Sequence, residues 1–353
     1  MREACSQAER GLGKTAPNPA VGCVIVKGGR ELARGYHRRA GRPHAEIEAL
    51  RRAGVAARGA TAYVTLEPCC HHGKTGPCTE ALVVAGVARV VAGCRDPDPR
   101  VAGKGLAALR RRGIETRSGV EKARCEDLIR GFSHWVAHGE PWVHLKLAAS
   151  LDGRIAAHGG ESKWISSPES RTVVQSLRAR ADAIAVGVGT VLADDPRLTC
   201  RLRGARHPLR VILDSAVRTP PDARVVTGDG ECVIACSADA PAARIKRVER
   251  AGAEVFILPG RGERRWRNLL MELGRRSTHE LLLEGGSAVA TSALTAGVVN
   301  AMTVFYNARL IGADGVPLVG PLGVTHPENA LQVQSSSWTP CGPDLMWTGR
   351  FSR

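Results

Sequence analysis

Aromatic residues are scarce in this chain of 353 residues, which contains only 4 Phe, 3 Tyr and 6 Trp. Proteins that bind single-stranded nucleic acid stack bases on aromatic side chains, so this scarcity argues against such a platform. Lys and Arg together number 50 against 34 acidic residues, which gives a formal net charge of +16. These basic residues are scattered singly and in short pairs, without a long run. We therefore expect no nucleic-acid partner, and small phosphorylated ligands would also suit so basic a protein.

Long apolar runs are missing as well. No stretch approaches the roughly 20 residues that a membrane-spanning helix requires, so we expect no membrane partner. The first residues show no basic segment that leads into an apolar one, which argues against a secretory signal and predicts a cytoplasmic protein. The 11 cysteines are then expected to be thiols and metal ligands rather than disulfides. Four of them lie in apolar, strand-like runs and are predicted to be core residues: Cys23, Cys94, Cys232 and Cys236.

The length of the chain fits two domains better than one, and a content of 43% hydrophobic residues indicates that both are folded. Gly139-Glu140-Pro141 marks a short linker, so we predict domains 1–139 and 140–353. In the first domain the pattern predicts strands at 21–26, 60–65 and 88–92, and helices at 44–52, 79–84 and 104–112. This alternation predicts an α/β fold, with a sheet that has helices on both faces.

The second domain shows the same alternation. Strands are predicted at 142–147, 183–188, 209–213, 232–236, 255–258 and 281–283, and helices at 168–178 and 287–294. Residues 187–190 (GVGT) lack the third glycine that a Gly-x-Gly-x-x-Gly dinucleotide turn would have. The motif alone is therefore only a weak indication of a cofactor site.

Three short segments of the first domain contain the residue types of a metal centre. They are His44-Ala45-Glu46, Pro68-Cys69 and Pro77-Cys78. A neutral imidazole and two thiolates form a three-ligand zinc site with one coordination position open for water. Zinc lowers the pKa of that water, and Glu46 is placed to move the protons as general acid and base. Nucleobase deaminases use this pattern, although their generic signature has two residues between the cysteines and this chain has eight.

Two other interpretations of these segments stay open. A structural zinc site would be closed by four protein ligands, and Cys70, His71 and His72 are available as a fourth. Alternatively, Cys69 and Cys70 could form a redox pair, although adjacent cysteines rarely serve in that way. A glutamate beside a closed site would have no purpose, so Glu46 favours the catalytic interpretation.

Further motifs surround these residues in the first domain. They are residues 17–22 (PNPAVG), 35–37 (GYH), 43–46 (PHAE), 65–69 (TLEPC), 71–75 (HHGKT), 96–99 (DPDP) and 101–105 (VAGKG). The series closely resembles the deaminase half of the bifunctional riboflavin-biosynthesis deaminase/reductase family. The resemblance implies a cytidine-deaminase-like three-layer fold with one zinc ion. It also implies that the substrate is 2,5-diamino-6-ribosylamino-4(3H)-pyrimidinone 5′-phosphate, which loses its 2-amino group.

The same resemblance implies roles for single residues. Zinc would bind His44, Cys69 and Cys78, with Glu46 as the proton donor. Asn18 would contact the pyrimidine, and His71 and Lys74 would reach the 5′-phosphate from the long loop between the cysteines. Two positions depart from the family pattern: Cys70 replaces a usual Ser, and Gly76 replaces the first Pro of Thr-Pro-Pro-Cys. Neither of them is a predicted ligand.

The second domain contains residues 145–153 (LKLAASLDG), 160–166 (GESKWIS), 189–196 (GTVLADDP) and 283–286 (LEGG). These motifs look like the reductase half of the same family. The resemblance implies a dihydrofolate-reductase-like domain that uses NADPH to reduce the ribosyl group of 5-amino-6-(5-phosphoribosylamino)uracil to a ribityl chain. The turn at 285–287, which opens a predicted helix, suits a diphosphate because it presents backbone N–H groups.

Site residues in this domain are also implied by the resemblance. NADPH contacts would come from Ala148, Trp164, Thr190, Asp194, Ser215 and Gly286. Substrate contacts would come from Ser162, Arg178, Leu198, Arg201 and Glu284. Arg178 and Arg201 are expected to grip the phosphate, because a guanidinium suits forked binding. Asn300-Ala301 stands where relatives usually have Asp-Glu, and we expect this departure to affect subunit packing more than catalysis.

Three functions remain to be compared. A bifunctional zinc deaminase and NADPH reductase accounts for both halves of the chain, and we also expect a homo-oligomer. A nucleic-acid-editing deaminase would use the basic charge but leaves the second domain unexplained. A non-catalytic zinc module, or a chain with one inactive half, conflicts with intact motifs in both halves.

Overall fold

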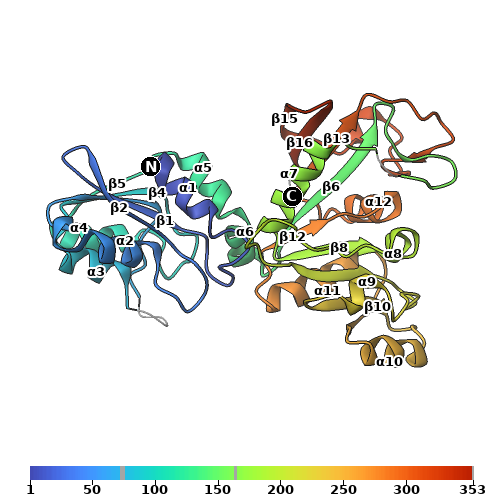
Figure 1. The fold of residues 1–353 in the computed structure, drawn as a ribbon, viewed down its shortest axis with the longest axis horizontal. Coiled ribbons are helices and arrows are strands. Elements are labelled where there is room, and N and C mark those ends of the chain that lie inside the picture. Colours follow the sequence, from blue (N-terminus) through green and yellow to red (C-terminus); the bar gives the residue numbers. More distant parts are fainter. Residues whose placement is uncertain (72–75, 163–164, 352–353) are drawn as a thin grey trace. The chain divides into compact units, whose positions relative to one another are not determined.

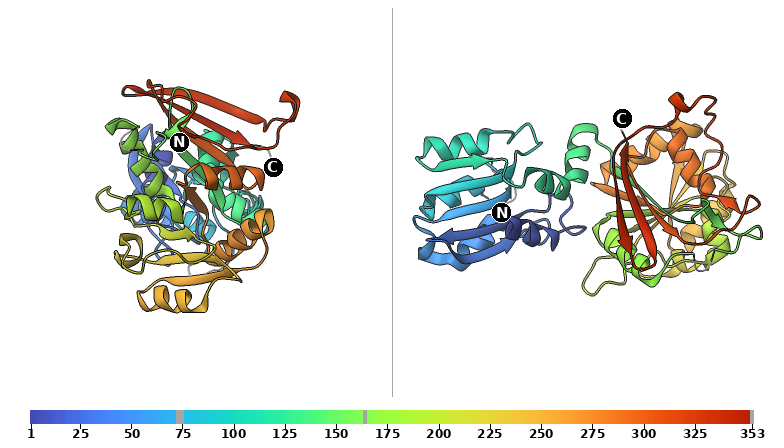
Figure 2. Two further views of the ribbon diagram at one scale, coloured as in Figure 1. Left: turned by 90° about the vertical axis from the view of Figure 1, so that its right-hand side faces the viewer. Right: turned by 90° about the horizontal axis from the view of Figure 1, so that it is seen from above.

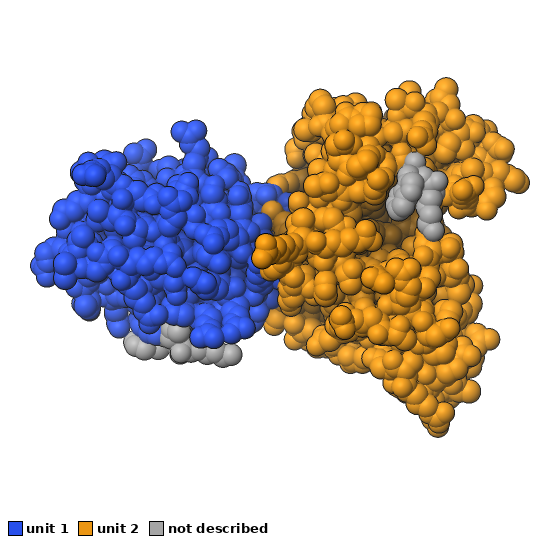
Figure 3. All heavy atoms as spheres, in the orientation of Figure 1, with its two compact units in different colours: residues 1–139 blue, residues 140–353 orange. Residues whose placement is uncertain are grey.

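The computed structural model describes residues 1–71, 76–162 and 165–351 (Figure 1). The chain divides into two compact units, Met1–Gly139 and Glu140–Arg353, which are coloured separately in Figure 3. Within the described ranges, no helix has both the length and the hydropathy of a membrane span.

A five-stranded sheet in the order β2-β1-β3-β4-β5 forms the centre of the first unit. Its strands are β1 (Gly22–Lys27), β2 (Arg30–Tyr36), β3 (Thr61–Leu66), β4 (Arg89–Cys94) and β5 (Glu115–Ser118). β1 is antiparallel to β2 and β3, whereas β3, β4 and β5 are mutually parallel. The three strands predicted from the sequence are present as β1, β3 and β4, and the sheet acquires β2 and β5 at its edges.

Helices cover both faces of this sheet, as the alternation predicted (Figure 1). One face carries α1 (Arg2–Glu9) and α5 (Lys122–Leu128), and the other carries α2 (Ala45–Ala53), α3 (Cys78–Val84) and α4 (Lys104–Arg111). The short helix η1 (Gly54–Ala57) follows α2, and α6 (Arg130–His138) ends the unit. This arrangement is the expected three-layer fold. Cys23 and Cys94 are buried in β1 and β4, as predicted.

The second unit is built on a nine-stranded sheet, in the order β11-β10-β9-β8-β12-β6-β13-β16-β15. The first seven strands in this order are parallel, and the last two form an antiparallel hairpin. The strands are β6 (Trp142–Ser150), β8 (Ala183–Gly187), β9 (Leu209–Leu213), β10 (Cys232–Ser237), β11 (Glu254–Leu258), β12 (Glu280–Leu283), β13 (Ala301–Asn307), β15 (Val333–Cys341) and β16 (Asp344–Phe351). β7 (Arg154–Ala156) and β14 (Val316–Pro317) pair separately.

Two apolar cores lie on opposite faces of this parallel sheet, because both faces of such a sheet are covered by helices. Leu281 and Leu283 pack in one core with α11 (Gly262–Arg275) and α12 (Ser287–Thr295). Leu282 points into the other core, which includes residues of α8 (Val188–Asp194), α9 (Arg224–Thr227) and α10 (Ala242–Arg250). α7 (Pro168–Arg180) precedes β8, and the short helix η2 (Pro327–Asn329) precedes β15. Figure 2 shows these layers from two further directions.

All six strands predicted for this unit are present, as are the helices predicted at 168–178 and 287–294. Cys232 and Cys236 are buried in β10, as expected. The sequence patterns missed helices α8 to α11, strand β13, the β15–β16 hairpin and the short strands β7 and β14. β13 nevertheless pairs with β6 along seven residues and extends the sheet beyond it.

Candidate functional site

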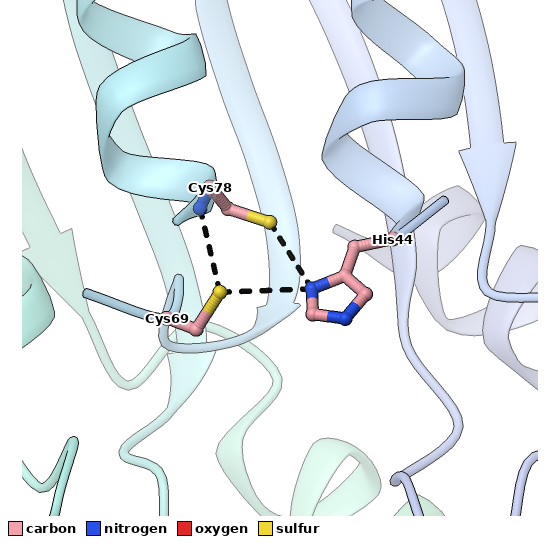
Figure 4. Close-up of side chains that lie close together, drawn as sticks. All are labelled: His44, Cys69 and Cys78. Carbon is pink, nitrogen blue, oxygen red and sulfur yellow. Dashed lines mark hydrogen bonds between the residues drawn. The ribbon is translucent and has the colours of Figure 1, made fainter. Parts of the chain in front are cut away.

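Three predicted metal ligands converge in the first unit. The Nδ1 atom of His44 lies 3.2 Å from Sγ of Cys78 and 3.6 Å from Sγ of Cys69 (Figure 4). Their ligand atoms all lie within 4.8 Å of one another, as the donors of one metal ion must. One imidazole and two sulfurs form the donor set of a zinc site with an open position.

Local structure places these ligands at the starts of two helices. His44 is the N-cap of α2, and Cys78 is the first residue of α3, after Pro77. Cys69 follows the end of β3, and its sulfur accepts a hydrogen bond from the backbone N–H of Cys78 at 3.3 Å. Hydrogen bonds from the Cys78 thiol and from His44 lower the pKa of Cys69 to about 4. A thiolate, the form that binds metal, is therefore favoured at Cys69.

The loop that carries Cys69 is held in place by Glu67, a buried residue. Its carboxylate accepts hydrogen bonds from the backbone N–H groups of Gly103 at 2.8 Å and Leu106 at 3.0 Å, at the start of α4. Gly105 permits this approach, because a Cβ atom there would lie 2.1 Å from the carbonyl oxygen of Pro68. The segment 101–105, which the sequence analysis identified only as a motif, thus anchors the loop that carries Cys69, a predicted metal ligand.

Glu46 lies on α2, two residues after His44, and its side chain is buried. Burial, with a contribution from the nearby charge of Cys69, raises the pKa of Glu46 to about 7. A carboxyl group with such a pKa can both take up and release a proton near neutral pH, as a general acid and base must.

A cavity of about 360 Å³ opens beside these residues, and its lining includes His44, Glu46, Cys69, Asn18 and His71. Cys78 is not among the lining residues. Lys74, His72 and the rest of 72–75 lie outside the described residues. The cavity therefore brings together the ligands, the proposed acid and base, and two of the predicted substrate contacts.

His37 is a cavity residue that the sequence reasoning did not single out, although it stands in the motif at 35–37. Its Nδ1 atom lies 3.1 Å from the carbonyl oxygen of Pro43, so it must carry the proton and donate. Nε2 is then an acceptor, and the Nδ2 amide group of Asn18 donates to it at 3.0 Å. This bond orients the amide of Asn18 and leaves its oxygen available to a ligand.

The alternative of a closed structural site gains no support from the described residues. The metal-ligating group found among them contains His44, Cys69 and Cys78, without Cys70 or His71. Cys70 is partly exposed, and Gly76 has open space around its Cα atom.

The second unit contains a larger cavity of about 1330 Å³ at the carboxyl ends of its parallel strands. Most of the residues predicted for this unit line it: Ala148, Ser162, Arg178, Thr190, Asp194, Arg201, Glu284 and Gly286. Ser215 and Leu198 are not among its lining residues, and Trp164 lies outside the described residues. Ser215 is exposed just beyond β9, and Leu198 is buried with a φ of +51°.

Three partly buried charged side chains line the wall of this cavity. Arg178 donates two hydrogen bonds of 2.8 Å to the carboxylate of Glu284 and a third, at 3.0 Å, to the carbonyl oxygen of Thr199. Burial opposes the charge of Glu284, but Arg178 outweighs it and the pKa of Glu284 lies below its usual value. Lys146 adds a second cation, whose pKa is lowered by burial. The sequence motif at 145–153 contains Lys146 but does not mark it as a site residue.

The turn at 285–287 has the geometry of a phosphate cradle. Gly286 is the N-cap of α12, and no side chain caps the helix. Gly285 is required by packing, because a Cβ atom there would lie 2.5 Å from Cβ of Val289. The exposed N–H groups of such a helix start favour an anion. The residues present thus fit a dinucleotide, which also matches the size of the cavity.

Asn300-Ala301, which differs from the Asp-Glu usual in the family, lies inside this unit. Both residues are buried, and the side-chain oxygen of Asn300 accepts a hydrogen bond of 2.8 Å from the N–H of Val143. The asparagine therefore joins the start of β13 to β6.

A deaminase-type metal centre in one unit and a large cofactor-sized cavity in the other define a two-site enzyme. Family models agree with this division. Residues 1–94 match the cytidine and deoxycytidylate deaminase zinc-binding region, and residues 141–347 match the RibD C-terminal domain.

Whole-chain relatives identify the family. The chain is 42% identical to the riboflavin biosynthesis protein RibD of Escherichia coli strain K12, over 98% of this chain and 96% of the relative. It is 39% identical to RibD of Aquifex aeolicus, with 98% and 96% coverage. The chain belongs to the RibD family, and it is a bifunctional deaminase and reductase of riboflavin biosynthesis.

Solved structures of this family have the same fold as this chain. Acinetobacter baumannii RibD superposes with a TM-score of 0.89 at 36% identity, covering 100% of this chain and 98% of the other. A structure from Thermotoga maritima, described as a diaminohydroxyphosphoribosylaminopyrimidine deaminase/5-amino-6-(5-phosphoribosylamino)uracil reductase, gives 0.85 at 35% identity, with 100% and 97% coverage.

Proposed function

We propose that residues 1–139 remove the 2-amino group of 2,5-diamino-6-ribosylamino-4(3H)-pyrimidinone 5′-phosphate. His44, Cys69 and Cys78 would hold one zinc ion, whose Lewis acidity makes a water molecule nucleophilic near neutral pH. The observation that supports this proposal most strongly is the convergence of these three donors beside the buried carboxyl group of Glu46.

In this proposal Glu46 takes a proton from the attacking water and delivers it to the exocyclic nitrogen, so that ammonia leaves. Asn18, oriented by His37, holds the pyrimidine through its amide oxygen. His71 and Lys74 bind the 5′-phosphate from the loop between the cysteines. Burial of Glu46 keeps bulk water away from the proton that it transfers.

We propose that residues 140–353 reduce the ribosyl group of 5-amino-6-(5-phosphoribosylamino)uracil with NADPH, which supplies a hydride when bound. The proposed cofactor contacts are Gly286, Thr190, Asp194 and Ala148, which line the large cavity. Trp164 and Ser215 are further proposed contacts, which the family resemblance alone implies. Ser162, Leu198, Arg201 and Glu284 are the proposed substrate contacts.

Arg178 is proposed to bind the substrate phosphate as well as to pair with Glu284. Three of its N–H groups are engaged by Glu284 and Thr199, so the ion pair fixes the guanidinium before any phosphate arrives. A guanidinium has five N–H donors, and the remaining ones can contribute to the phosphate with Arg201. Lys146 lies in the same wall and adds positive charge near the substrate.

Mass spectrometry of the purified full chain with its starting pyrimidine tests both steps. Without NADPH, the deaminated phosphoribosyl compound should accumulate; with NADPH, the ribityl product should replace it. Reduction before deamination, or no change of the substrate with NADPH present, would contradict the proposal. A cytoplasmic location, a homo-oligomeric state and the absence of a nucleic-acid partner stay predictions.

A further inference from the structure

Residues 309–321, here called the wall segment, form one side of the large cavity in the second unit. The segment follows β13, and its strand β14 pairs with β7, where Val316 lies opposite Ala156. None of the sequence motifs described above includes it. Four of its residues nevertheless line the cavity: Val316, Pro317, Gly320 and Pro321.

The wall segment borders the start of α12, where the phosphate cradle lies. The hydroxyl of Thr291 accepts a hydrogen bond of 2.7 Å from the N–H of Gly320 and donates one of 2.7 Å to the carbonyl oxygen of Ser287. On β7, Ile155 lies next to the same turn, because a Cβ atom on Gly286 would be 4.0 Å from its Cδ1 atom. The position of the wall segment therefore sets the width of the cavity beside the cradle.

Asp152 fastens the other end of the wall segment. Its carboxylate accepts hydrogen bonds from the backbone N–H groups of Gly312 at 2.7 Å and Ile311 at 3.1 Å. The hydroxyl of Ser150, a buried residue, donates to the same carboxylate at 2.5 Å. The hydrogen bond from Ser150, together with those from the wall segment, lowers the pKa of Asp152 to about 2. Asp152 is therefore ionised near neutral pH and makes charge-assisted hydrogen bonds to the wall segment.

Backbone hydrogen bonds flank this contact on both sides. The N–H of Leu151 donates to the carbonyl oxygen of Arg309 at 2.8 Å, and the N–H of Leu318 donates to that of Gly153 at 2.8 Å. Asp152 itself is exposed. Its replacement would thus remove one anchor of the wall segment without leaving a cavity in the apolar core.

We propose that Asp152 is a positioning residue, which holds the wall segment against the start of α12 and so strengthens the binding of NADPH. The proposal rests on the proposed use of NADPH in this cavity. Asp152 is not among the lining residues, so it acts through the wall segment. A wall that is ordered before the cofactor arrives removes part of the entropy cost of binding.

Fluorescence titration of the full chain with NADPH tests this role. Asp152→Ala should raise the Kd for NADPH roughly tenfold, as expected when one charge-assisted anchor is lost. Both the kcat at saturating NADPH and the KM for the pyrimidine substrate should change less than about twofold, because the loss is confined to cofactor binding. Asp152→Asn keeps one acceptor oxygen for the wall segment and should restore most of the affinity.

Hydrogen exchange of the same proteins provides a measurement that does not depend on turnover. Backbone exchange in residues 309–321 should be faster in Asp152→Ala than in the native chain, and NADPH should slow it again. Asp314→Ala is the matched control. Asp314 is exposed in the same segment, and its carboxylate forms no hydrogen bond or ion pair with the residues that the structure describes. This variant removes the same charge and should leave the Kd for NADPH unchanged.

Native affinity for NADPH in Asp152→Ala would overturn the positioning role, whether or not exchange of the wall segment rises. An equal loss of affinity for NADPH and for the pyrimidine substrate would also overturn it, because it would indicate a general structural role. An equal effect of Asp314→Ala would overturn it in favour of simple charge repulsion. Failure of the native chain to bind NADPH would instead contradict the proposed function itself.

Discussion

The two units of this chain form their sites in different ways. The first gathers a few chemically distinctive side chains at the starts of α2 and α3, beside a cavity of about 360 Å³. The second spreads its site over the ends of several parallel strands, around a cavity of about 1330 Å³ whose lining combines glycines and small side chains with charged ones such as Arg178, Arg201 and Glu284. A metal centre depends on which atoms are present, whereas a cofactor site depends mainly on shape. Substitution of a site residue should therefore abolish function almost completely in the first unit, whereas in the second unit it should reduce function only partly.

The largest effect is expected at the metal ligands. Cys69→Ala and Cys78→Ala should each remove nearly all zinc from a chain that otherwise holds about one ion, because each takes away one of the three donors found among the described residues. Metal analysis of the purified proteins measures this loss. Cys70→Ala is the control, since Cys70 is not part of the ligating group, and it should keep its zinc. Full zinc content in both ligand variants would refute the site.

Glu46→Gln should lower deamination by about two to four orders of magnitude, because it removes proton transfer without removing a ligand. Zinc content should stay at the native level. Glu48→Gln is a control on the same helix, where Glu48 pairs with Arg52 at 3.4 Å, and it should leave the rate nearly unchanged. Loss of zinc along with activity in Glu46→Gln would show that Glu46 acts as a ligand or support.

In the second unit, Glu284→Gln should reduce stability. It leaves the partly buried Arg178 and Lys146 without their carboxylate. Breaking a fully buried pair costs roughly 3–5 kcal/mol, and that range is the upper bound here. Calorimetric unfolding of the full chain would show it as a lower transition temperature. Glu263→Gln, which removes an exposed pair with Arg267, should cost less than about 1 kcal/mol. Equal shifts for the two variants would contradict the importance of burial.

Arg201→Ala should have the smallest of these effects. Its proposed phosphate contact is worth about 1.5–3 kcal/mol, because charge-assisted hydrogen bonds fall in that range. The KM of the reductase for its pyrimidine substrate should rise roughly ten- to a hundredfold, while the affinity for NADPH changes much less. Steady-state kinetics with each substrate varied in turn separates the two. A rise confined to the KM for NADPH would move Arg201 to the cofactor.

The contrast between the units also explains what the sequence could predict. His44, Glu46, Cys69 and Cys78 are recognisable because few other combinations of residues do the same chemistry, and the structure brings them together. Lys146 was not predicted as a site residue, because nothing in a strand pattern reveals which face a lone lysine occupies. His37 was likewise missed, since its role depends on bonds to Asn18 and Pro43 that only the fold creates.

Only some of the elements that were missed lack a signal in the sequence. β15 is exposed along most of its length, so no alternation of apolar residues marks it. α11, by contrast, buries Trp266, Leu269, Leu270 and Leu273 at helical spacing, so its pattern was available in the sequence. Six of the seven parallel strands were found because they are short apolar runs, as strands buried on both faces must be. The seventh, β13, was missed.

The most direct test of two chemically separate sites supplies the deaminated phosphoribosyl compound and NADPH to the full-length Glu46→Gln chain. NADPH oxidation and the ribityl product should appear at the native rate, because Glu46 belongs only to the first unit, while the original pyrimidine should stay unchanged in the same protein. A reductase rate that falls in parallel with deamination, in a folded chain that keeps its zinc, would contradict the assignment of the two reactions to separate sites.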